Sequence, residues 1–182
     1  MQKHFTTRAT YFLQEGIENL DQCLAIAFQA AKEQKIGKIV VFTARGEGVR
    51  RALENFCTRP EHEHIKVVAV TFPAGKSFTD EGGNSINVEI SDENMKLFQS
   101  RGVPIIKAHL PFNPIASVYG QQGSLGQDLS LVGEALNMFG GSMRLCVQAI
   151  TLACDAGAVE LGEHVIALTS DTAILARATS TR

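Results

Sequence analysis

The strongest constraint on the fold is the repeated alternation of short, continuous apolar runs with helical apolar patterns. The runs cover residues 38–43, 66–72, 104–110, 164–169 and 172–178. Apolar runs of this length, with little polar interruption, are typical of strands that are buried on both faces of a parallel sheet. The sequence therefore predicts a sheet built mainly from parallel strands.

Helical patterns fill the intervals between these runs. The first follows i, i+3, i+4, i+7 spacing from Leu20 to Ala31, with Asn19 as the expected N-cap, Gln22 at the capping-box position and Gly37 as the stop. Further helices are expected over 49–56, after a cap at Ser91, over 129–139, and from a cap at Ser142 to residue 156. A short β-prone stretch at 9–13 precedes them.

Strand–helix alternation of this kind predicts an α/β protein with a doubly wound, mostly parallel sheet and helices on both faces. The chain has 182 residues, and at roughly 150 residues per domain this favours a single domain over 1–182.

Charge and cysteine usage restrict the setting. The formal net charge is −2, with 17 Lys+Arg against 19 Asp+Glu, so no nucleic-acid partner is expected. No apolar window reaches ~18 residues, and residues 1–10 hold no apolar core of signal-peptide length, so we expect neither a membrane span nor export. Cys23, Cys57, Cys146 and Cys154 form no C-x-x-C pair, which favours reduced thiols in a cytoplasmic protein.

Three loops follow predicted strands directly, over 43–48, 73–90 and 111–127. In a parallel sheet the carboxyl ends of the strands share one edge, where open α/β folds bind their ligands. Loops longer than about 12–15 residues are usually functional in compact domains, the alternative being that they are only mobile. We therefore expect a ligand site at this edge.

The loop 43–48 reads Thr-Ala-Arg-Gly-Glu-Gly and leads from a strand into a helix N-terminus. Unpaired amides and the positive end of the helix dipole favour an anion there, and Thr43 and Arg45 add a hydroxyl and a cation. We therefore expect this loop to bind phosphate. Arg51 replaces the third glycine of a dinucleotide fingerprint, and Val70 replaces the first glycine of a P-loop ending in Gly75-Lys76-Ser77, so neither motif is present.

Two weaker candidates stay open. The stretch Glu-His-Glu-His at 61–64 could bind a metal, although a solvated loop is the simpler interpretation. His109 ends a predicted strand at the ligand edge, where it could act as an acid or base or be a structural histidine.

Residues 38–60 resemble the strand–loop–helix of pyruvate kinase C-terminal domains. More of the chain is similar to the stand-alone pyruvate kinase C-terminal-domain-like family, whose activity is unassigned. The matching pieces lie in order at residues 10–12, 16–19, 38–53, 68–71, 101–102, 109, 145–147, 153–157 and 171–173.

This resemblance implies a three-layer α/β/α domain with a mixed sheet ordered 3-2-1-4-5. It implies that the 43–48 loop holds phosphate, with FMN or a similar phosphorylated molecule as ligand, and that subunits meet through helices in a homodimer. The expected ligand-binding residues are Glu18, Asn19, Thr43, Ala44, Arg45, Gly46, Glu47, Gly48, Thr71, His109, Asp171 and Thr172.

The leading functional hypothesis is thus a small-molecule-binding domain that holds a phosphate-bearing ligand. A chain of 182 residues has no room for the catalytic barrel of pyruvate kinase, so that activity is not expected. The alternative is a flavin-dependent or acid–base enzyme of unknown substrate, in which His109 and Asp171 would transfer protons.

Overall fold

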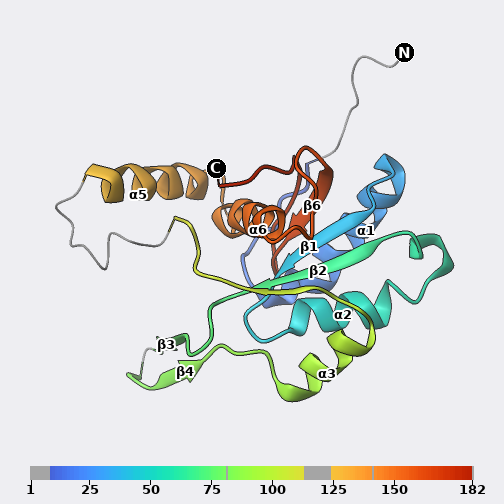
Figure 1. The fold of residues 1–182 in the computed structure, drawn as a ribbon, viewed down its shortest axis with the longest axis horizontal. Coiled ribbons are helices and arrows are strands. Elements are labelled where there is room, and N and C mark those ends of the chain that lie inside the picture. The colour runs from blue at the N-terminus through green and yellow to red at the C-terminus, as the bar shows by residue number, and fades with distance from the viewer. Residues whose placement is uncertain (1–8, 81, 113–123, 141, 182) are drawn as a thin grey trace, which may run out of the picture.

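The computed structural model describes residues 9–80, 82–112, 124–140 and 142–181. At its centre lies a sheet (Figure 1), which has five strands. The strands lie in the order β5 (Ile105–Lys107), β2 (Lys66–Thr71), β1 (Lys38–Phe42), β6 (His164–Leu168) and β7 (Ala173–Arg177). Neighbouring strands are parallel except β6 and β7, which pair antiparallel. Numbered along the chain within this sheet, the order is 3-2-1-4-5, and the predicted mostly parallel mixed sheet is confirmed.

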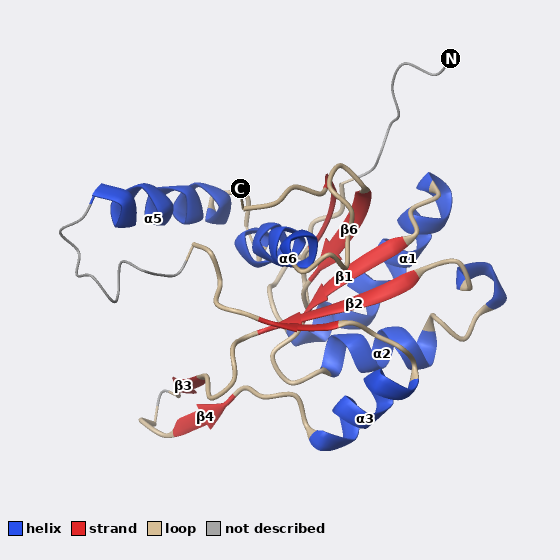
Figure 2. Ribbon diagram, viewed as in Figure 1, coloured by secondary structure: helices blue, strands red, loops and turns tan. Residues whose placement is uncertain are grey.

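Helices cover both faces of the sheet, so the domain has three layers (Figure 2). On one face lie α1 (Leu20–Gln34), α2 (Glu47–Asn55) and α3 (Asp92–Ser100), and on the other lies α6 (Met143–Asp155). Successive residues of β1 belong to the hydrophobic cores on opposite faces of the sheet. Ile39 and Val41 pack towards α1 and α2. Val40 and Phe42 pack towards α6. This two-sided burial explains why the strand is apolar at every position.

Helix α5 (Ser124–Asn137) packs against α6 and projects from the rest of the domain (Figure 1). Gly133 is buried on α5, and a Cβ at this position would lie 2.8 Å from the Arg144 guanidinium. Part of the predicted 111–127 loop precedes α5, and its residues 113–123 lie outside those that the structure describes.

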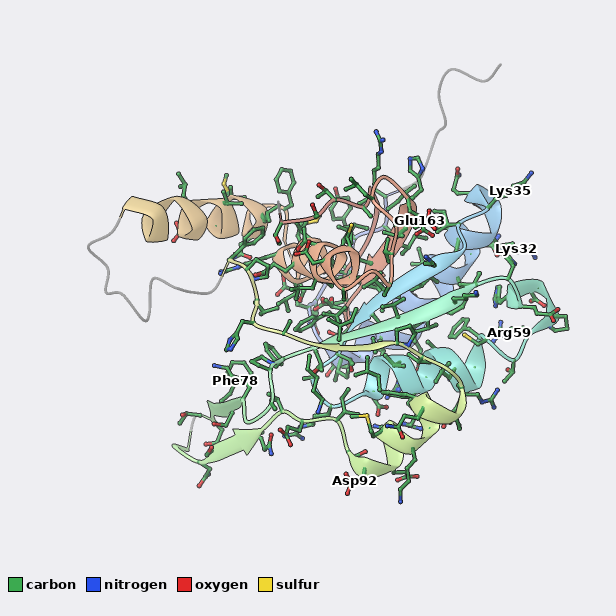
Figure 3. The ribbon with its side chains drawn as sticks, viewed as in Figure 1. Lys32, Lys35, Arg59, Phe78, Asp92 and Glu163 are labelled. Carbon is green, nitrogen blue, oxygen red and sulfur yellow. The ribbon has the colours of Figure 1, made fainter. Side chains whose placement is uncertain are left out.

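The predicted loop 73–90 contains a small hairpin of β3 (Ser77–Thr79) and β4 (Ser85–Asn87). Phe78 lies in β3 (Figure 3). Its ring centroid lies 5.2 Å from that of Phe72, and Lys76 Nζ lies 4.9 Å from the Phe78 ring. The prediction of a loop without secondary structure was wrong here, because strands of three largely exposed residues leave no apolar alternation in the sequence.

Several predicted helix ends differ in the structure. Asn19 makes no side-chain cap bond, because a 3-10 turn, η1 (Ile17–Asn19), leads directly into α1. Its Nδ2 donates instead to the Gln14 carbonyl. The helix ends at Lys35 in a left-handed conformation, φ 56°, so Gly37 is not its stop.

Of the two predicted serine caps, one is confirmed. Ser91 Oγ accepts from the Asn94 amide at the start of α3. Ser142 makes no side-chain cap bond to α6. Residues 9–13 form no strand, and Tyr11 and Leu13 are exposed there. Among the described residues, no helix has the length and apolar character needed to cross a membrane.

Candidate ligand pocket at the carboxyl edge of the sheet

A pocket of about 520 Å³ opens at the carboxyl ends of β1 and β6; we call it the edge pocket. Its volume falls within the range of about 300–1,000 Å³ that is typical of small-molecule sites. The residues that line it are Ile17, Leu20, Phe42, Thr43, Ala44, Arg45, Glu47, Gly48, Phe72, Ser142, Leu145, Thr169 and Ser170.

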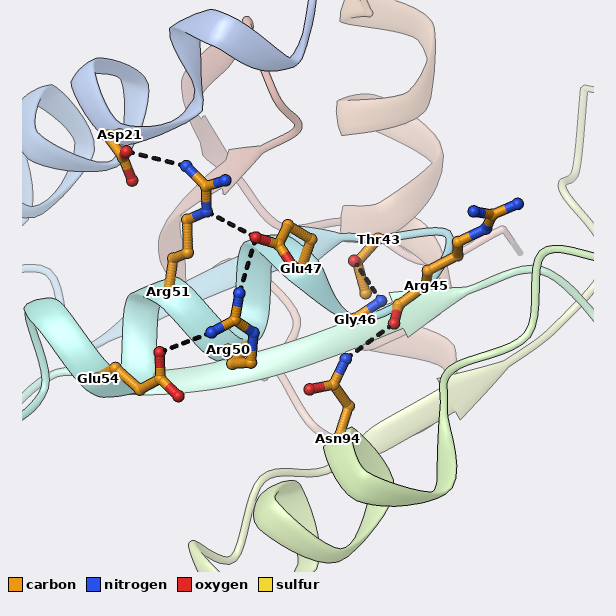
Figure 4. A network of polar contacts seen from close by, with 9 residues as sticks. All are labelled: Asp21, Thr43, Arg45, Gly46, Glu47, Arg50, Arg51, Glu54 and Asn94. Carbon is orange, nitrogen blue, oxygen red and sulfur yellow. Dashed lines mark hydrogen bonds and ion pairs between the residues drawn. The ribbon is translucent and has the colours of Figure 1, made fainter.

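The loop between β1 and α2 forms one wall, and its shape depends on glycine (Figure 4). Gly46 has φ 95°, and its amide donates to Thr43 Oγ1 at 3.0 Å. Asn94 Nδ2 donates to the Arg45 carbonyl at 3.0 Å, so α3 supports the loop from behind. A Cβ at Gly46 would lie 2.8 Å from Asn94 Nδ2, which leaves no room for a side chain.

Hydrogen-bond donors are available at this wall. Within the described part of the chain, no oxygen accepts from the amides of Ala44 or Arg45. The pocket also lies at the beginnings of four helical elements, since Ile17 and Leu20 begin η1 and α1, Glu47 begins α2, and Ser142 precedes α6. Helix N-termini carry unpaired amides and partial positive charge, so this arrangement favours an anion.

The arginines near this wall differ in their partners. Arg50 and Arg51 both bind the Glu47 carboxylate, with shortest distances of 2.9 and 2.7 Å, and Arg51 also reaches Asp21 at 2.8 Å. The hydrogen bond from Arg51 and the contacts with Arg50 lower the pKa of Glu47, so this acid stays ionised and paired. Arg45 is exposed and forms no ion pair with any described residue, and its side chain points away from the network (Figure 4).

The floor of the edge pocket is apolar and includes two aromatic rings. Phe42 ends β1 and Phe72 directly follows the neighbouring β2, and their ring centroids lie 5.0 Å apart in an edge-to-face arrangement. Leu20 and Leu145 line the pocket from the helices on either side of the sheet. A flat ring could therefore lie on the floor while an anionic group meets the loop.

Asp171, in the turn between β6 and β7, ties the neighbouring loops together. Its Oδ2 accepts from the Gly16 amide at 2.9 Å, which holds the start of η1 to the sheet. Its Oδ1 accepts from the hydroxyls of Thr169 and Thr172 at 3.3 and 3.2 Å. Thr172 Oγ1 in turn accepts from the Ser142 amide at 2.8 Å, so one carboxylate connects the beginnings of η1 and α6.

The structure distributes the predicted site residues over three places. Five line the edge pocket, namely Thr43, Ala44, Arg45, Glu47 and Gly48, and Gly46 shapes their loop. Asp171 and Thr172 line a second pocket. Glu18, Asn19, Thr71 and His109 line neither pocket.

Thr71 and His109 lie outside both pockets, in different environments. Thr71 is buried, and its hydroxyl donates to the Ala44 carbonyl at 3.4 Å, so it supports the loop from below. His109 is exposed beyond the end of β5. The proton-transfer pair of the alternative hypothesis, His109 with Asp171, is not brought together in one pocket.

Sequence reasoning missed the floor of the pocket. Phe42, Phe72 and Leu145 have the apolar patterns of ordinary core positions, and only the position of Phe42 and Phe72 at strand ends could have singled them out. Ser142, Thr169 and Ser170 also line the pocket. Each is a polar residue at or next to the end of a predicted strand or helix, and this position could have identified them as candidates.

The metal alternative at 61–64 finds no support. His62 is buried, and its Nδ1 lies 3.1 Å from the Phe56 carbonyl oxygen, as in a structural histidine. No group of three or more metal-ligating side chains occurs among the residues with described positions. All four cysteines are free thiols.

No family model matches the chain. Two solved structures similar to it are pyruvate kinases from Cryptosporidium parvum, one matching with 12% identity over 91% of this chain and 23% of its own length, the other with 13% over 88% and 23%. Both have a TM-score of 0.42. The chain thus spans about a quarter of the length of these proteins, and the assignment of its fold rests on the sheet topology described above.

Proposed function

We propose that this chain is a small-molecule-binding domain whose edge pocket holds a phosphate-bearing ligand with a flat apolar ring, such as FMN. One observation carries the proposal: an anion-favouring loop and an aromatic floor line the same pocket. The phosphate would accept from the amides of Ala44 and Arg45 and pair with the Arg45 guanidinium, while the ring lies against Phe42 and Phe72.

The electrostatics of the loop support this assignment. Because Glu47 is paired with Arg50 and Arg51, its charge opposes a bound anion less than an isolated carboxylate would. The attraction for phosphate is then local, and it comes from Arg45, the loop amides and the helix N-termini rather than from the overall charge of −2.

Titration calorimetry with FMN, riboflavin and inorganic phosphate tests the proposal. Riboflavin has the same ring without the phosphate, so FMN should bind more tightly than riboflavin, and phosphate should compete with FMN. At 100 times its Kd, FMN should stabilise the fold by about 2.7 kcal/mol in a thermal unfolding measurement. Equal affinity for FMN and riboflavin would remove the phosphate from the proposal, and absence of binding by all three compounds would overturn it.

The aromatic floor has its own test. Phe72→Ala should weaken FMN binding and leave the binding of inorganic phosphate unchanged, because only the ring contacts are removed. Phe78→Ala is the matched control, since Phe78 contacts Phe72 but does not line the pocket. A redox enzyme would additionally need a bound flavin, which absorbs near ~450 nm and is bleached by a reductant.

A further inference from the structure

A second pocket, of about 490 Å³, lies between α1, strands β6 and β7 and the segment 9–15; we call it the α1 pocket. It shares no lining residue with the edge pocket, and the tie from Gly16 to Asp171 lies between them. The residues that line it are Ala9, Thr10, Tyr11, Phe12, Gln14, Glu15, Cys23, Ile26, Ala27, Ala30, Phe139, Gly140, Met143, Ile166 and the run 171–175.

Most of this lining is apolar. Ile26, Ala27 and Ala30 lie along one face of α1, Ile174 comes from β7, and Phe139 follows α5. Small alanine side chains on the helix leave the space that the pocket occupies. The body of a ligand in this pocket would therefore be hydrocarbon or aromatic.

The α1 pocket carries the Asp171 carboxylate, which has no cationic partner among the described residues. Asp171 accepts from the Gly16 amide and from two threonine hydroxyls, all of which are neutral donors. No lysine, arginine or histidine occurs among the described residues that line the pocket. The described lining thus carries the Asp171 carboxylate and no basic group to neutralise it.

We propose that the α1 pocket binds an amphipathic organic amine. Its ammonium group would meet Asp171, and its apolar body would lie along α1 towards Ile26 and Phe139. A half-buried carboxylate beside apolar walls favours such a ligand, because the ammonium supplies the missing positive charge and the walls bury the body. This proposal stands independently of the phosphate site.

A pair of probes that differ only in charge tests it. 4-Phenylbutylamine and 4-phenylbutan-1-ol have the same apolar body, and only the amine is charged at neutral pH. In titration calorimetry with the full chain, the amine should bind at least about tenfold more tightly than the alcohol. Equal affinities, or absence of amine binding, would overturn the proposal.

Two alanine variants place the binding in this pocket. Ala30 lines the pocket and is half-buried, so Ala30→Leu should fill it and weaken amine binding at least about fivefold. Ala25→Leu is the matched control, because Ala25 is exposed on the same helix and lines neither pocket. Equal amine affinity in the two variants would contradict the proposal.

Asp171→Asn tests the charge itself. The asparagine keeps one acceptor oxygen, so the preference for amine over alcohol should fall to nearly none while the alcohol binds as before. Because Asp171 also holds Gly16, the fold of this variant is first checked by circular dichroism, and if it is unfolded the Ala30→Leu comparison decides. An unchanged preference in a folded variant would show that Asp171 is not the partner of the amine.

A second copy of the chain is the competing occupant. Light scattering with and without 4-phenylbutylamine distinguishes the two, since a small-molecule site leaves the mass of the protein unchanged. A fall in mass on addition of the amine would assign the pocket to a contact between copies and overturn the proposal.

Discussion

Arg45 is the residue on which phosphate affinity depends most in this account. Three arginines lie in or just after the loop between β1 and α2, and the sequence alone does not separate them. The structure does, because Arg50 and Arg51 are bound by Glu47 and by further acids, whereas Arg45 is exposed and lines the edge pocket. Pairing within α2 occupies Arg50 and Arg51, and Asp21 of α1 adds a second partner for Arg51, so Arg45 is the arginine of this loop left available to a ligand.

We predict that Arg45→Ala weakens binding of inorganic phosphate and of FMN by about tenfold, the usual effect of losing one charged hydrogen-bond donor. Titration calorimetry measures the change. Arg101→Ala is the control, since Arg101 is an exposed arginine at the end of α3 that does not line the pocket. Equal affinities in the two variants would place the site elsewhere.

Cys23 shows a second effect at this scale. Burial, with a smaller contribution from the Asp171 charge, raises the pKa of its thiol from 9.0 to about 12. In the unfolded chain the thiol ionises near its ordinary pKa, so its contribution to stability is complete below pH 9 and is lost as the pH rises towards 12.

The free energy of unfolding should therefore fall more steeply with pH in the wild type than in Cys23→Ala. The difference should approach about 1.4 kcal/mol per pH unit between about pH 9.5 and 10.5. Urea unfolding of both proteins at several pH values measures the free energy of unfolding. At pH 7 the thiol is protonated in both the folded and the unfolded state, so the difference between the two proteins at this pH gives the effect of removing the packing contacts of the sulfur. Parallel pH dependences would contradict the assigned shift.

At the scale of elements, the sequence predicts well where burial is two-sided and poorly where contacts are local. The apolar runs of β1, β2 and β6 were recognised because both of their faces meet helices. The hairpin of β3 and β4 was missed because its strands are short and largely exposed. Residues 9–13 have strand propensity but pair with no strand in the described part of the chain, so propensity alone misled.

The conformation of the β1–α2 loop depends on Gly46. Gly46→Ala should destabilise the fold by about 2–3 kcal/mol, because the residue has φ 95° and its Cβ would lie 2.8 Å from Asn94 Nδ2. Gly102→Ala should cost only about 1 kcal/mol, since Gly102 has φ 65° but an open surrounding. Chemical unfolding compares them, and equal losses would mean that the contact with α3 does not restrict the loop.

At the scale of the whole molecule, the sequence predicted the topology and a site at the carboxyl edge of the sheet, but it did not predict the apolar floor of the pocket. The residues of the 43–48 loop are contiguous in the sequence, so they could be recognised as one motif. The floor combines Phe42, Phe72 and Leu145 from three separate elements, and each of them has the pattern of a core residue. Only the folded arrangement of β1, β2 and α6 brings these three side chains beside the loop.

Some expectations stay predictions at this scale. They are the single domain over 1–182, the cytoplasmic setting and the homodimer. The mass in solution from light scattering tests the last of these, and a monomer at all accessible concentrations would contradict it.

The loop between Thr43 and Gly48 is the proposed binding site for phosphate. The most direct test is to follow backbone amide resonances of the labelled chain while inorganic phosphate, and then FMN, is added. We expect the amides of Ala44 and Arg45 to shift most with both ligands, and the resonances of Phe42 and Phe72 to respond to FMN alone. Saturable shifts confined to another surface, or no shifts at these amides, would contradict it.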